Sequence, residues 1–243
     1  MESNYKEKFY SKYVSQHNHN LYGDTSLEII KNQFTAWNNY YSGFLTGNTD
    51  ANIVDLGCGN GGFVYWLRSL DYKNAVGVDV SSEQIELGKK IGISGIEKDD
   101  LSNFLKTRKN FFDLIFIRDV LGHFEKAEVL EIMELIFESL KKGGTLIIKT
   151  PNAESPMSGR LRYGDFTHDT SFTGSSLKQI LLAYGFDAVQ VFSVRPTAHG
   201  PISFLRLILW FCIELRLRLY RLVEAGSGVG VFTQNVIVIA KKS

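Results

Sequence analysis

The stretch that most constrains this chain runs from Asn52 to Gly62 and reads N-I-V-D-L-G-C-G-N-G-G. Ile53, Val54 and Leu56 form the short apolar run expected of a strand that is buried on both faces. Four glycines then follow within six residues, namely Gly57, Gly59, Gly61 and Gly62. Apolar residues resume at helical spacing from Phe63. A strand, a glycine loop and a helix in this order predict a nucleotide-like ligand at the helix N-terminus.

Two kinds of ligand compete for this loop, and a glycine-rich turn without any ligand is the alternative to both. Gly57, Gly59 and Gly62 match G-x-G-x-x-G, the dinucleotide fingerprint, which is a weak signal by itself. The carboxylate of Asp55 is more informative, because it would repel a pyrophosphate but suits a ligand that carries an ammonium group. We therefore expect a ligand that has no phosphate at this loop.

The pattern D-x-G-x-G-x-G resembles motif I of the class I S-adenosylmethionine (SAM)-dependent methyltransferases, in which the loop wraps the methionine end of SAM. The resemblance covers most of the chain from Ser26 onward. It implies SAM as the cofactor. It also implies cofactor contacts from the first strand and its loop, at Asp55, Gly57, Cys58, Gly59 and Gly61.

The second apolar run, Ala75–Val80, ends in an acidic residue roughly twenty positions after the glycines, where a carboxylate can accept both hydroxyls of a ribose. An NAD enzyme would share this residue, Asp79, so it supports an adenosine ligand without selecting the cofactor. A simple turn residue is the alternative. The family resemblance adds Val80 and Arg118 to the cofactor site.

A third, short strand is expected before Asp99, Asp100 and Leu101. In the family, an Asp at this strand end often bonds the adenine amino group. One sequence does not choose between the two aspartates. Asp100 is preferred, because Leu101 can then flank the base.

The fourth strand, residues 112–117, is followed by R-D-V-L-G-H-F, which resembles a family motif in which V-L-E-H is common. Gly122 stands where that pattern usually has Glu, so no role for a carboxylate is carried over. His123 would lie at the carboxyl edge of the sheet, beside the crevice where open α/β sheets bind ligands. It is a candidate general base, and a structural histidine that caps the next helix is the alternative.

Residues 155–173 form a long polar segment, and such segments are usually functional or disordered. The segment resembles the Y-G-D-F-T-H part of methyltransferases from bacterial capsule, O-antigen and other surface-glycan biosynthesis. That resemblance implies an acceptor site with Arg160, Arg162 and Tyr163 as substrate contacts. His168 or Asp165 would accept the hydroxyl proton. These two residues could instead pair with the arginines and fix the loop, and the two roles are compatible.

Composition narrows the partners of the chain. A net charge of +1 over 243 residues leaves no general nucleic-acid footprint, and no Asn-Pro-Pro-Tyr or Asp-Pro-Pro-Tyr tetrapeptide follows the fourth strand. We therefore expect a small-molecule or glycan acceptor and no nucleic acid. Cys58 and Cys212 suggest neither a disulfide framework nor a metal site, and no metal is expected. No basic-then-apolar leader opens the chain, so a cytoplasmic protein is expected.

The fold that the resemblance implies is a single α/β domain, 1–243, with a Rossmann-like seven-stranded, mostly parallel sheet, helices on both faces and an antiparallel last strand. Residues 1–50 would form a helical lid over the cofactor, in which Ser26 opens an amphipathic helix that extends to Tyr41. Residues 51–195 would form the SAM-binding core, and 231–243 the last strand.

Residues 196–230 would be an apolar helical insertion. Its longest uninterrupted apolar run, Leu207–Ile213, is far shorter than a bilayer span. We expect this segment to be buried on the sheet or to form a homodimer contact. A peripheral contact with the cytoplasmic face of a membrane is the alternative.

Together these features predict a metal-independent SAM-dependent methyltransferase that acts on a sugar hydroxyl in surface-polysaccharide biosynthesis, with His168 or His123 as the base. Methylation of another small molecule, such as a quinone or a phosphorylated metabolite, is the runner-up. A non-catalytic SAM- or nucleotide-binding accessory protein is the alternative from a different class. A Rossmann dehydrogenase comes third.

Overall fold

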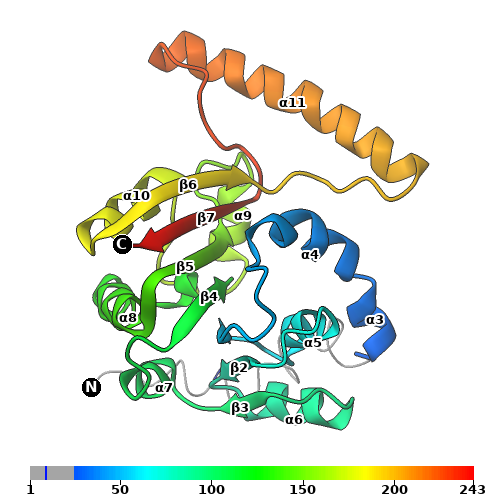
Figure 1. Cartoon of the computed structure of the whole chain (residues 1–243). Helices are drawn as coiled ribbons and strands as arrows, with labels where there is room; N and C mark the ends of the chain where they lie inside the picture. The colour runs from blue at the N-terminus through cyan, green and yellow to red at the C-terminus, as the bar shows by residue number, and fades with distance from the viewer. Residues whose placement is uncertain (1–8, 10–24) are drawn as a thin grey trace.

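Seven strands form one sheet in the order β3-β2-β1-β4-β5-β7-β6, as the computed structural model shows (Figure 1). The structure describes residue 9 and residues 25–243. The strands are β1 (Ile53–Leu56), β2 (Ala75–Asp79), β3 (Ile96–Lys98), β4 (Phe112–Arg118), β5 (Leu140–Pro151), β6 (Phe186–Ser193) and β7 (Asn235–Lys242). Apart from Phe9, the aromatic residues expected in a lid between Tyr5 and Tyr22 lie outside the described residues.

The pairing of the strands confirms the predicted sheet. β1 pairs in parallel with β2 and β4, and the parallel pairing continues to β3 on one side and to β5 on the other. β7 runs antiparallel to both β5 and β6. The carboxyl ends of the other six strands therefore meet at one edge of the sheet, as in open α/β folds that bind ligands.

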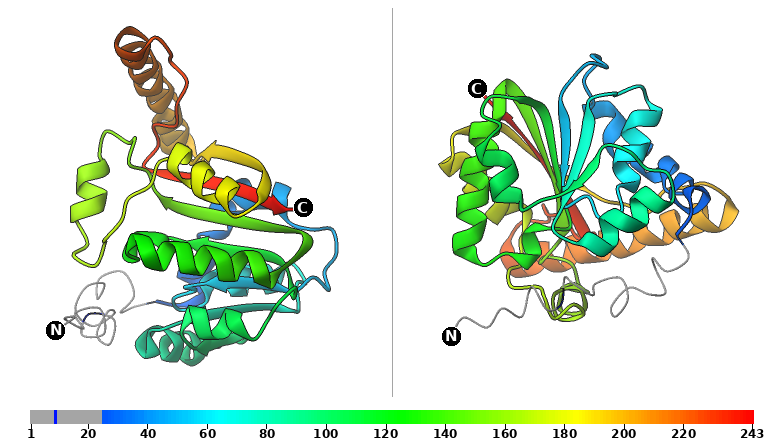
Figure 2. Two further views of the ribbon diagram at one scale, coloured as in Figure 1. Left: turned by 90° about the vertical axis from the view of Figure 1, so that its left-hand side faces the viewer. Right: turned by 90° about the horizontal axis from the view of Figure 1, so that it is seen from below.

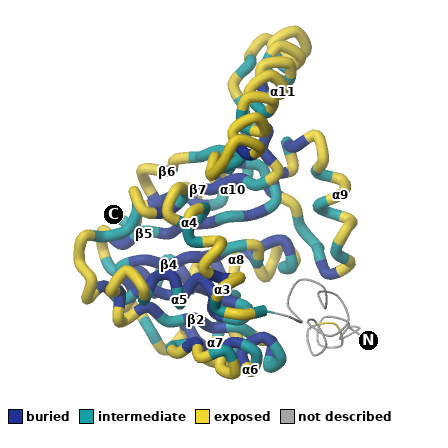
Figure 3. Tube along the Cα trace, turned by 90° about the vertical axis from the view of Figure 1, so that its right-hand side faces the viewer, coloured by how far each residue is buried: buried dark blue, intermediate teal, exposed yellow. Residues whose placement is uncertain are grey.

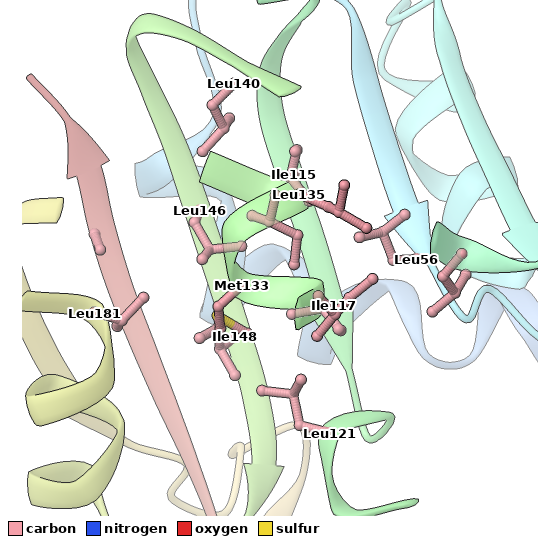
Figure 4. Packing of buried hydrophobic residues seen from close by; sticks show 14 of the residues in the cluster. Leu56, Ile115, Ile117, Leu121, Met133, Leu135, Leu140, Leu146, Ile148 and Leu181 are labelled. Carbon is pink, nitrogen blue, oxygen red and sulfur yellow. The ribbon is translucent and has the colours of Figure 1, made fainter. Parts of the chain in front are cut away.

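Helices cover both faces of the sheet (Figures 1 and 2). They are α3 (Leu27–Lys31), α4 (Phe34–Tyr41), α5 (Gly62–Ser69), α6 (Ser82–Lys90), α7 (Leu101–Lys106), α8 (Lys126–Ser139), α9 (Ser158–Tyr163), α10 (Gly174–Ala183) and α11 (Pro201–Ala225), with the short 3-10 helices η2 (Ser42–Phe44) and η3 (Leu121–His123). One core joins the sheet to α7, α8 and α10, and Figure 4 shows its packing. The other core joins the sheet to α3, α4, α5 and α6.

The amphipathic helix expected from Ser26 to Tyr41 is in fact two helices. Ser26 caps the first, α3, by accepting a hydrogen bond from the Ile29 backbone N–H at 3.4 Å. The chain turns before α4, which brings the ring of Trp37 to 5.3 Å from the ring of Phe63 on α5. Packing on α5 therefore sets the direction of α4, and the periodicity of the sequence alone does not reveal the break.

The insertion between β6 and β7 forms the long helix α11, which begins with Pro201 and ends before the left-handed Gly226 at φ 70°. The views in Figures 1 and 2 agree that α11 lies apart from the sheet, along its β6–β7 side. Most of its side chains are exposed, so the expectation of burial on the sheet was wrong. No helix within residues 25–243 combines the length and apolar character needed to cross a bilayer.

Candidate active site

A cavity of about 760 Å³ opens at the carboxyl ends of β1, β2 and β4. This volume lies within the range of about 300–1,000 Å³ that is common for small-molecule sites. Its walls come from the glycine loop, α3, α4, the start of α6, the β3–α7 connection and the segment that follows β4. Its lining residues include Gln33, Trp37, Gly57, Cys58, Gly59, Asn60, Asp79, Val80, Gln84, Asp100, Leu101, Arg118, Asp119, His123 and Lys149.

The glycine loop forms one wall because its backbone turns in ways that side chains oppose. Gly57, Gly59 and Gly61 have φ values of +71°, +56° and +79°, where residues with a Cβ atom are strained. A Cβ atom on Gly57 would also lie 2.2 Å from Cγ2 of Val120. Gly57 and Gly59 line the cavity, as does Cys58. Gly61 is not among the lining residues, and it instead occupies the N-cap position of α5.

Asp79 ends β2 and joins the glycine loop to the cavity. One carboxylate oxygen accepts a hydrogen bond from the backbone N–H of Gly59 at 2.8 Å, and the other accepts one from Ser81 at 2.8 Å. Burial raises the pKa of Asp79, and these two backbone donors act in the opposite direction. A carboxylate oxygen has more than one lone pair, so both oxygens can also accept from the hydroxyls of a ribose.

Asp55 lies behind the cavity, not in its wall. Its side chain is fully buried and accepts two hydrogen bonds from Arg118, at 3.2 Å from Nε and 3.0 Å from Nη2. Burial raises the pKa of Asp55, and the Arg118 guanidinium opposes that shift. The two-pronged geometry requires both carboxylate oxygens to accept, so we assign an ionised pair. The group that Asp55 presents to the cavity is therefore the guanidinium of Arg118, not a carboxylate for an ammonium group.

The two aspartates after β3 have different surroundings. Asp100 and Leu101 line the cavity, and Asp99 is not among the lining residues. Asp100 also caps α7, since its Oδ1 accepts hydrogen bonds from Ser102 and Asn103 at 3.0 and 3.1 Å. Asp99 accepts a hydrogen bond from the backbone N–H of Asp100 at 2.8 Å. Val80, which follows β2, is another lining residue.

Gln84 on α6 is a cavity residue that was not predicted from the sequence. The residue is 4% exposed, and its Oε1 atom has no hydrogen-bond partner among the described residues. A buried amide oxygen without a donor is costly, so this atom is suited to accept a hydrogen bond from a bound ligand. Gln84 stands three residues after Ser81, so the sequence predicted a helix-capping role for its side chain and gave no sign of a ligand contact. Trp37 of α4 was also missed, because aromatic residues of this segment are expected to serve packing.

The cavity therefore fits SAM by the chemistry of its walls. Asp79 would hold the ribose, Asp100 and Leu101 the adenine, and Arg118 the carboxylate of the methionine end. The Oε1 atom of Gln84 adds an acceptor. SAM supplies an electrophilic methyl group when it is bound.

His123 reaches the cavity from η3 and belongs to a chain of hydrogen bonds. Its Nδ1 lies 2.9 Å from Oγ1 of Thr167, and that hydroxyl donates to Oδ1 of Asp165 at 2.6 Å. Because the Thr167 proton points to Asp165, we assign the Nδ1 proton to His123 and its imidazole lone pair to Nε2. Burial, followed by the nearby His168, lowers the pKa of His123 below its ordinary value of 6.5, which favours the neutral ring.

His168 lies beside His123, with ring centroids 4.5 Å apart. Its Nδ1 lies 3.0 Å from the carbonyl oxygen of Leu161, which can only accept, so this Nδ1 carries a proton. Hydrogen bonds to Thr167 lower the pKa of Asp165 against the opposing effect of burial, which is the largest single influence. The structure thus brings together the three predicted catalytic residues, and His123 is the member that lines the cavity.

The same three residues carry the only geometry for a metal ion among the described residues. One ligand atom from each of His123, Asp165 and His168 lies within 4.8 Å of the other two. The Nδ1 atoms of both histidines and an oxygen of Asp165 already have hydrogen-bond partners within the protein.

Gly122 explains how the 155–173 segment reaches this site. A Cβ atom at position 122 would lie 3.1 Å from Cδ2 of His168, which is tighter than most real contacts. The Gly122 carbonyl also accepts hydrogen bonds from the backbone N–H groups of Asp169 and Thr170, at 2.8 and 3.0 Å. The absence of a side chain at Gly122 therefore makes room for a histidine from a distant loop.

The predicted acceptor contacts Arg160, Arg162 and Tyr163 lie on α9, a short helix within a segment that was expected to be a loop. None of them is among the cavity-lining residues. Arg162 donates to the backbone carbonyl oxygen of Asp169 at 2.6 Å, which is a different contact from the predicted pairing of the arginines with Asp165 or His168. Tyr163 is 83% exposed, so it does not contribute to a closed acceptor site within the described residues.

Comparison with curated proteins points to methyltransferases. The chain is 30% identical over 137 residues to phosphoethanolamine N-methyltransferase 1 from Arabidopsis thaliana. This alignment covers 52% of this chain and 27% of the relative. The chain is also 27% identical over 103 residues to a tRNA U34 carboxymethyltransferase from Desulfotalea psychrophila. That alignment covers 40% of this chain and 32% of the relative. The chain thus spans about a third or less of the length of these two relatives.

Solved structures have the same fold. A SAM-dependent methyltransferase from Archaeoglobus fulgidus aligns with a TM-score of 0.66 at 22% identity, over 98% of this chain and 98% of that one. Phosphoethanolamine N-methyltransferase 2 from Haemonchus contortus, solved in complex with SAM, aligns with a TM-score of 0.60 at 14% identity, over 96% of this chain and 60% of that one. A family model described as a methyltransferase domain matches residues 30–191. The chain therefore belongs to the family of SAM-dependent methyltransferase domains.

Proposed function

We propose that this methyltransferase transfers the methyl group of SAM to a hydroxyl oxygen of a sugar, and that His123 takes the hydroxyl proton. The observation that carries the proposal is the hydrogen-bonded chain Asp165–Thr167–His123, which ends in a histidine that lines the cofactor cavity. An alcohol is a weak nucleophile, so a base that accepts its proton accelerates transfer by about 10²–10⁴-fold.

The environment of His123 suits a base. Its lowered pKa keeps the ring neutral at pH 7, so Nε2 can accept a proton. Thr167 and Asp165 hold the tautomer that leaves the lone pair on Nε2, as a carboxylate does for the histidine of a catalytic triad. A nucleophile that is already basic, such as an amine, would need this arrangement less.

The sugar part of the proposal depends on the likeness of the 155–173 segment to glycan methyltransferases, and on Asp165 and His168 in that segment. Holding the acceptor oxygen in line with the methyl group would supply much of the remaining acceleration. The named relatives act on phosphoethanolamine and tRNA, so an amine acceptor of the first kind is the comparison that the assay must include.

The test is a methyl-transfer assay with radiolabelled SAM, in which nucleotide-linked and lipid-linked sugars are offered beside phosphoethanolamine. We expect label in a sugar, and a fall of about 10²–10⁴-fold in kcat for His123→Asn with little change in SAM affinity. The wild-type rate should rise with pH through a midpoint below 6.5, because the neutral form of His123 is the active one. Thr167→Val should lower kcat less and shift this midpoint.

Two results would contradict the proposal. One is transfer to phosphoethanolamine with no transfer to any sugar, and the other is an unchanged rate in the His123→Asn variant.

Incubation with EDTA tests whether His123 and His168 hold a metal ion that the reaction needs. We expect no loss of activity on chelation, because the proposed base needs no ion, and a loss that zinc or magnesium restores would instead assign the three side chains to a metal.

A further inference from the structure

Helix α11 turns a mixed face with three charged residues toward the protein body and leaves most of its large apolar side chains exposed, although amphipathic helices usually bury their apolar side. Its buried and half-buried positions recur every three or four residues, which marks the inward face. They are Ser203, Leu207, Trp210, Glu214, Leu217, Arg218 and Arg221. The inward face therefore includes three charged residues and a serine beside three apolar residues.

Ion pairs attach this inward face to the rest of the molecule. Glu214 is 6% exposed and accepts two hydrogen bonds from Arg195, both at 3.0 Å, and two from Arg218, at 2.6 and 3.1 Å. Arg221 pairs with Glu154, which follows β5, at 3.1 Å. These ion pairs hold one side of α11 against the molecule, and most of its large apolar residues lie on the opposite side.

The outward face is exposed, as the yellow colour along α11 in Figure 3 shows, and most of its residues are apolar. Nine large hydrophobic side chains of α11 are at least half exposed, namely Ile202 (79%), Phe204 (57%), Leu205 (54%), Leu209 (53%), Leu215 (69%), Leu219 (60%), Tyr220 (65%), Leu222 (50%) and Val223 (81%). At about 100° per residue, the apolar arc spans roughly 200° of the helix circumference. An exposed apolar surface of this width, interrupted only by Arg216 among its outermost residues, marks an interaction site.

The width and charge of the outward face favour a membrane surface over a second copy of the chain. One partner helix covers a narrow seam of a and d positions, which would leave much of the apolar arc exposed, whereas a lipid surface covers all of it. In an antiparallel pair of these helices centred near Leu215, the two exposed Arg216 side chains would meet. Beside a membrane, Arg216 and Arg206 can reach lipid phosphates while their stems stay in the apolar layer.

We propose that α11 lies in the plane of an anionic phospholipid surface and inserts its outward face among the lipids. The helix leaves the sheet at the carboxyl end of β6 and returns at the start of β7, so both connections lie at the edge that carries the candidate active site. The Arg221–Glu154 pair joins α11 to the residue that directly precedes the 155–173 segment. Docking in this way would hold the site beside the membrane surface, within reach of a lipid-linked acceptor.

The test is flotation of the full chain with vesicles of phosphatidylcholine and phosphatidylglycerol (3:1), compared with phosphatidylcholine alone. We expect the protein to float with the anionic vesicles and to bind at least tenfold less in a Leu215→Glu/Leu219→Glu variant. A matched control, Leu130→Glu/Leu182→Glu, changes leucines that are 47% and 52% exposed on other helices, and it should bind like the wild type. The circular dichroism spectra of both variants should match that of the wild type.

Cys212 gives a second readout, since it is exposed on α11 and Cys58 is buried. An environment-sensitive fluorophore on Cys212 should shift to the blue when anionic vesicles are added. Protein that stays out of the floated fraction, or a label that does not respond, would overturn the proposal. So would a stable dimer that the outward-face variant converts to a monomer without any vesicle binding. None of these outcomes requires methyl transfer, so the result stands apart from the proposed acceptor.

Discussion

At the scale of single residues, the cofactor cavity is built by carboxylates that also have structural partners. Asp79 accepts the backbone N–H groups of Gly59 and Ser81, and Asp100 caps α7, while both face the cavity. Asp55 has no share of the cavity wall, because Arg118 takes both of its oxygens. The hydrogen bonds that each carboxylate already accepts within the protein thus decide whether it can also bind the cofactor.

Asp79→Ala should weaken SAM binding by about 100-fold or more. The variant removes two charge-assisted hydrogen bonds to the ribose, each worth about 1.5–3 kcal/mol, and tenfold in affinity corresponds to about 1.4 kcal/mol. Calorimetric titration with SAM and with S-adenosylhomocysteine measures the change. Asp99→Ala is the matched control, since this neighbouring strand-end carboxylate is outside the cavity. Equal losses in the two variants would argue against the ribose contact.

At the scale of elements, the acceptor side of the site depends on how the 155–173 segment packs on η3. The Gly122 carbonyl accepts two backbone hydrogen bonds from this segment, and Thr170 donates its hydroxyl to the carbonyl oxygen of Phe124 at 2.6 Å. These contacts hold Thr167 and His168 beside His123. The loop and the short helix therefore form one unit, although more than thirty residues separate them in the sequence.

Gly122→Ala should reduce methyl transfer by about tenfold or more while the SAM affinity stays near that of the wild type. The added Cβ atom would lie 3.1 Å from the His168 ring and push the loop away from His123. Turnover and calorimetry on the same preparation separate the two effects. Gly159→Ala on α9 is the control, because a Cβ atom at this position would have no neighbour within 4 Å, and it should keep full activity. A normal rate in Gly122→Ala would show that the loop tolerates displacement.

At the scale of the whole molecule, α11 is joined to the core chiefly by charge. Arg195 precedes the helix, Glu214 and Arg218 lie within it, and Arg218 also donates to the carbonyl oxygen of Gly228 at 3.1 Å. Tyr40 of α4 donates to the carbonyl oxygen of Arg195 at 2.7 Å, so the anchor reaches the second core. The methyltransferase core and its outlying helix are in this way coupled through few, strong contacts.

Glu214→Gln should destabilise the protein by about 1–2 kcal/mol at pH 7. This loss is smaller than the value of about 3–5 kcal/mol for breaking a fully buried pair, because water partly screens Arg195 and Arg218, which are 40% and 39% exposed. Urea unfolding of the variant and the wild type measures it, and Glu224→Gln on the same helix is the control. Equal stability of the variant and the wild type would mean that α11 is held by other contacts.

The difference should also depend on pH in a defined direction. Hydrogen bonds from Arg195, aided by Arg218 and opposed by burial, lower the pKa of Glu214 in the folded protein below its ordinary value of 4.5. The stabilisation is therefore fully present above pH 4.5 and is lost as the pH falls through the folded-state pKa. Repeating the comparison at a pH below 4 should reduce the gap between the two proteins.

Features that depend on neighbours in sequence were predictable. The buried runs at β1 and β2, the glycine turn and the acidic end of β2 follow from local sterics and hydrogen bonding, and they predicted a nucleotide-like ligand with Asp79 beside it. The seven-stranded sheet and SAM as the ligand were predicted from the family resemblance. The same local rules gave an unbroken helix from Ser26, because helical periodicity does not reveal a turn that packing against α5 imposes.

Features that depend on distant partners were decided only by the tertiary structure. Arg118 lies 63 residues from Asp55, and the pairing of the two decides which charge reaches the cavity. Thr167 lies 44 residues from His123, and its hydroxyl sets the tautomer of the candidate base. For α11, the sequence predicted an apolar helical insertion, but not which side it would turn inward. That side carries Glu214 and Arg221, because their partners Arg195 and Glu154 are supplied by segments outside the helix.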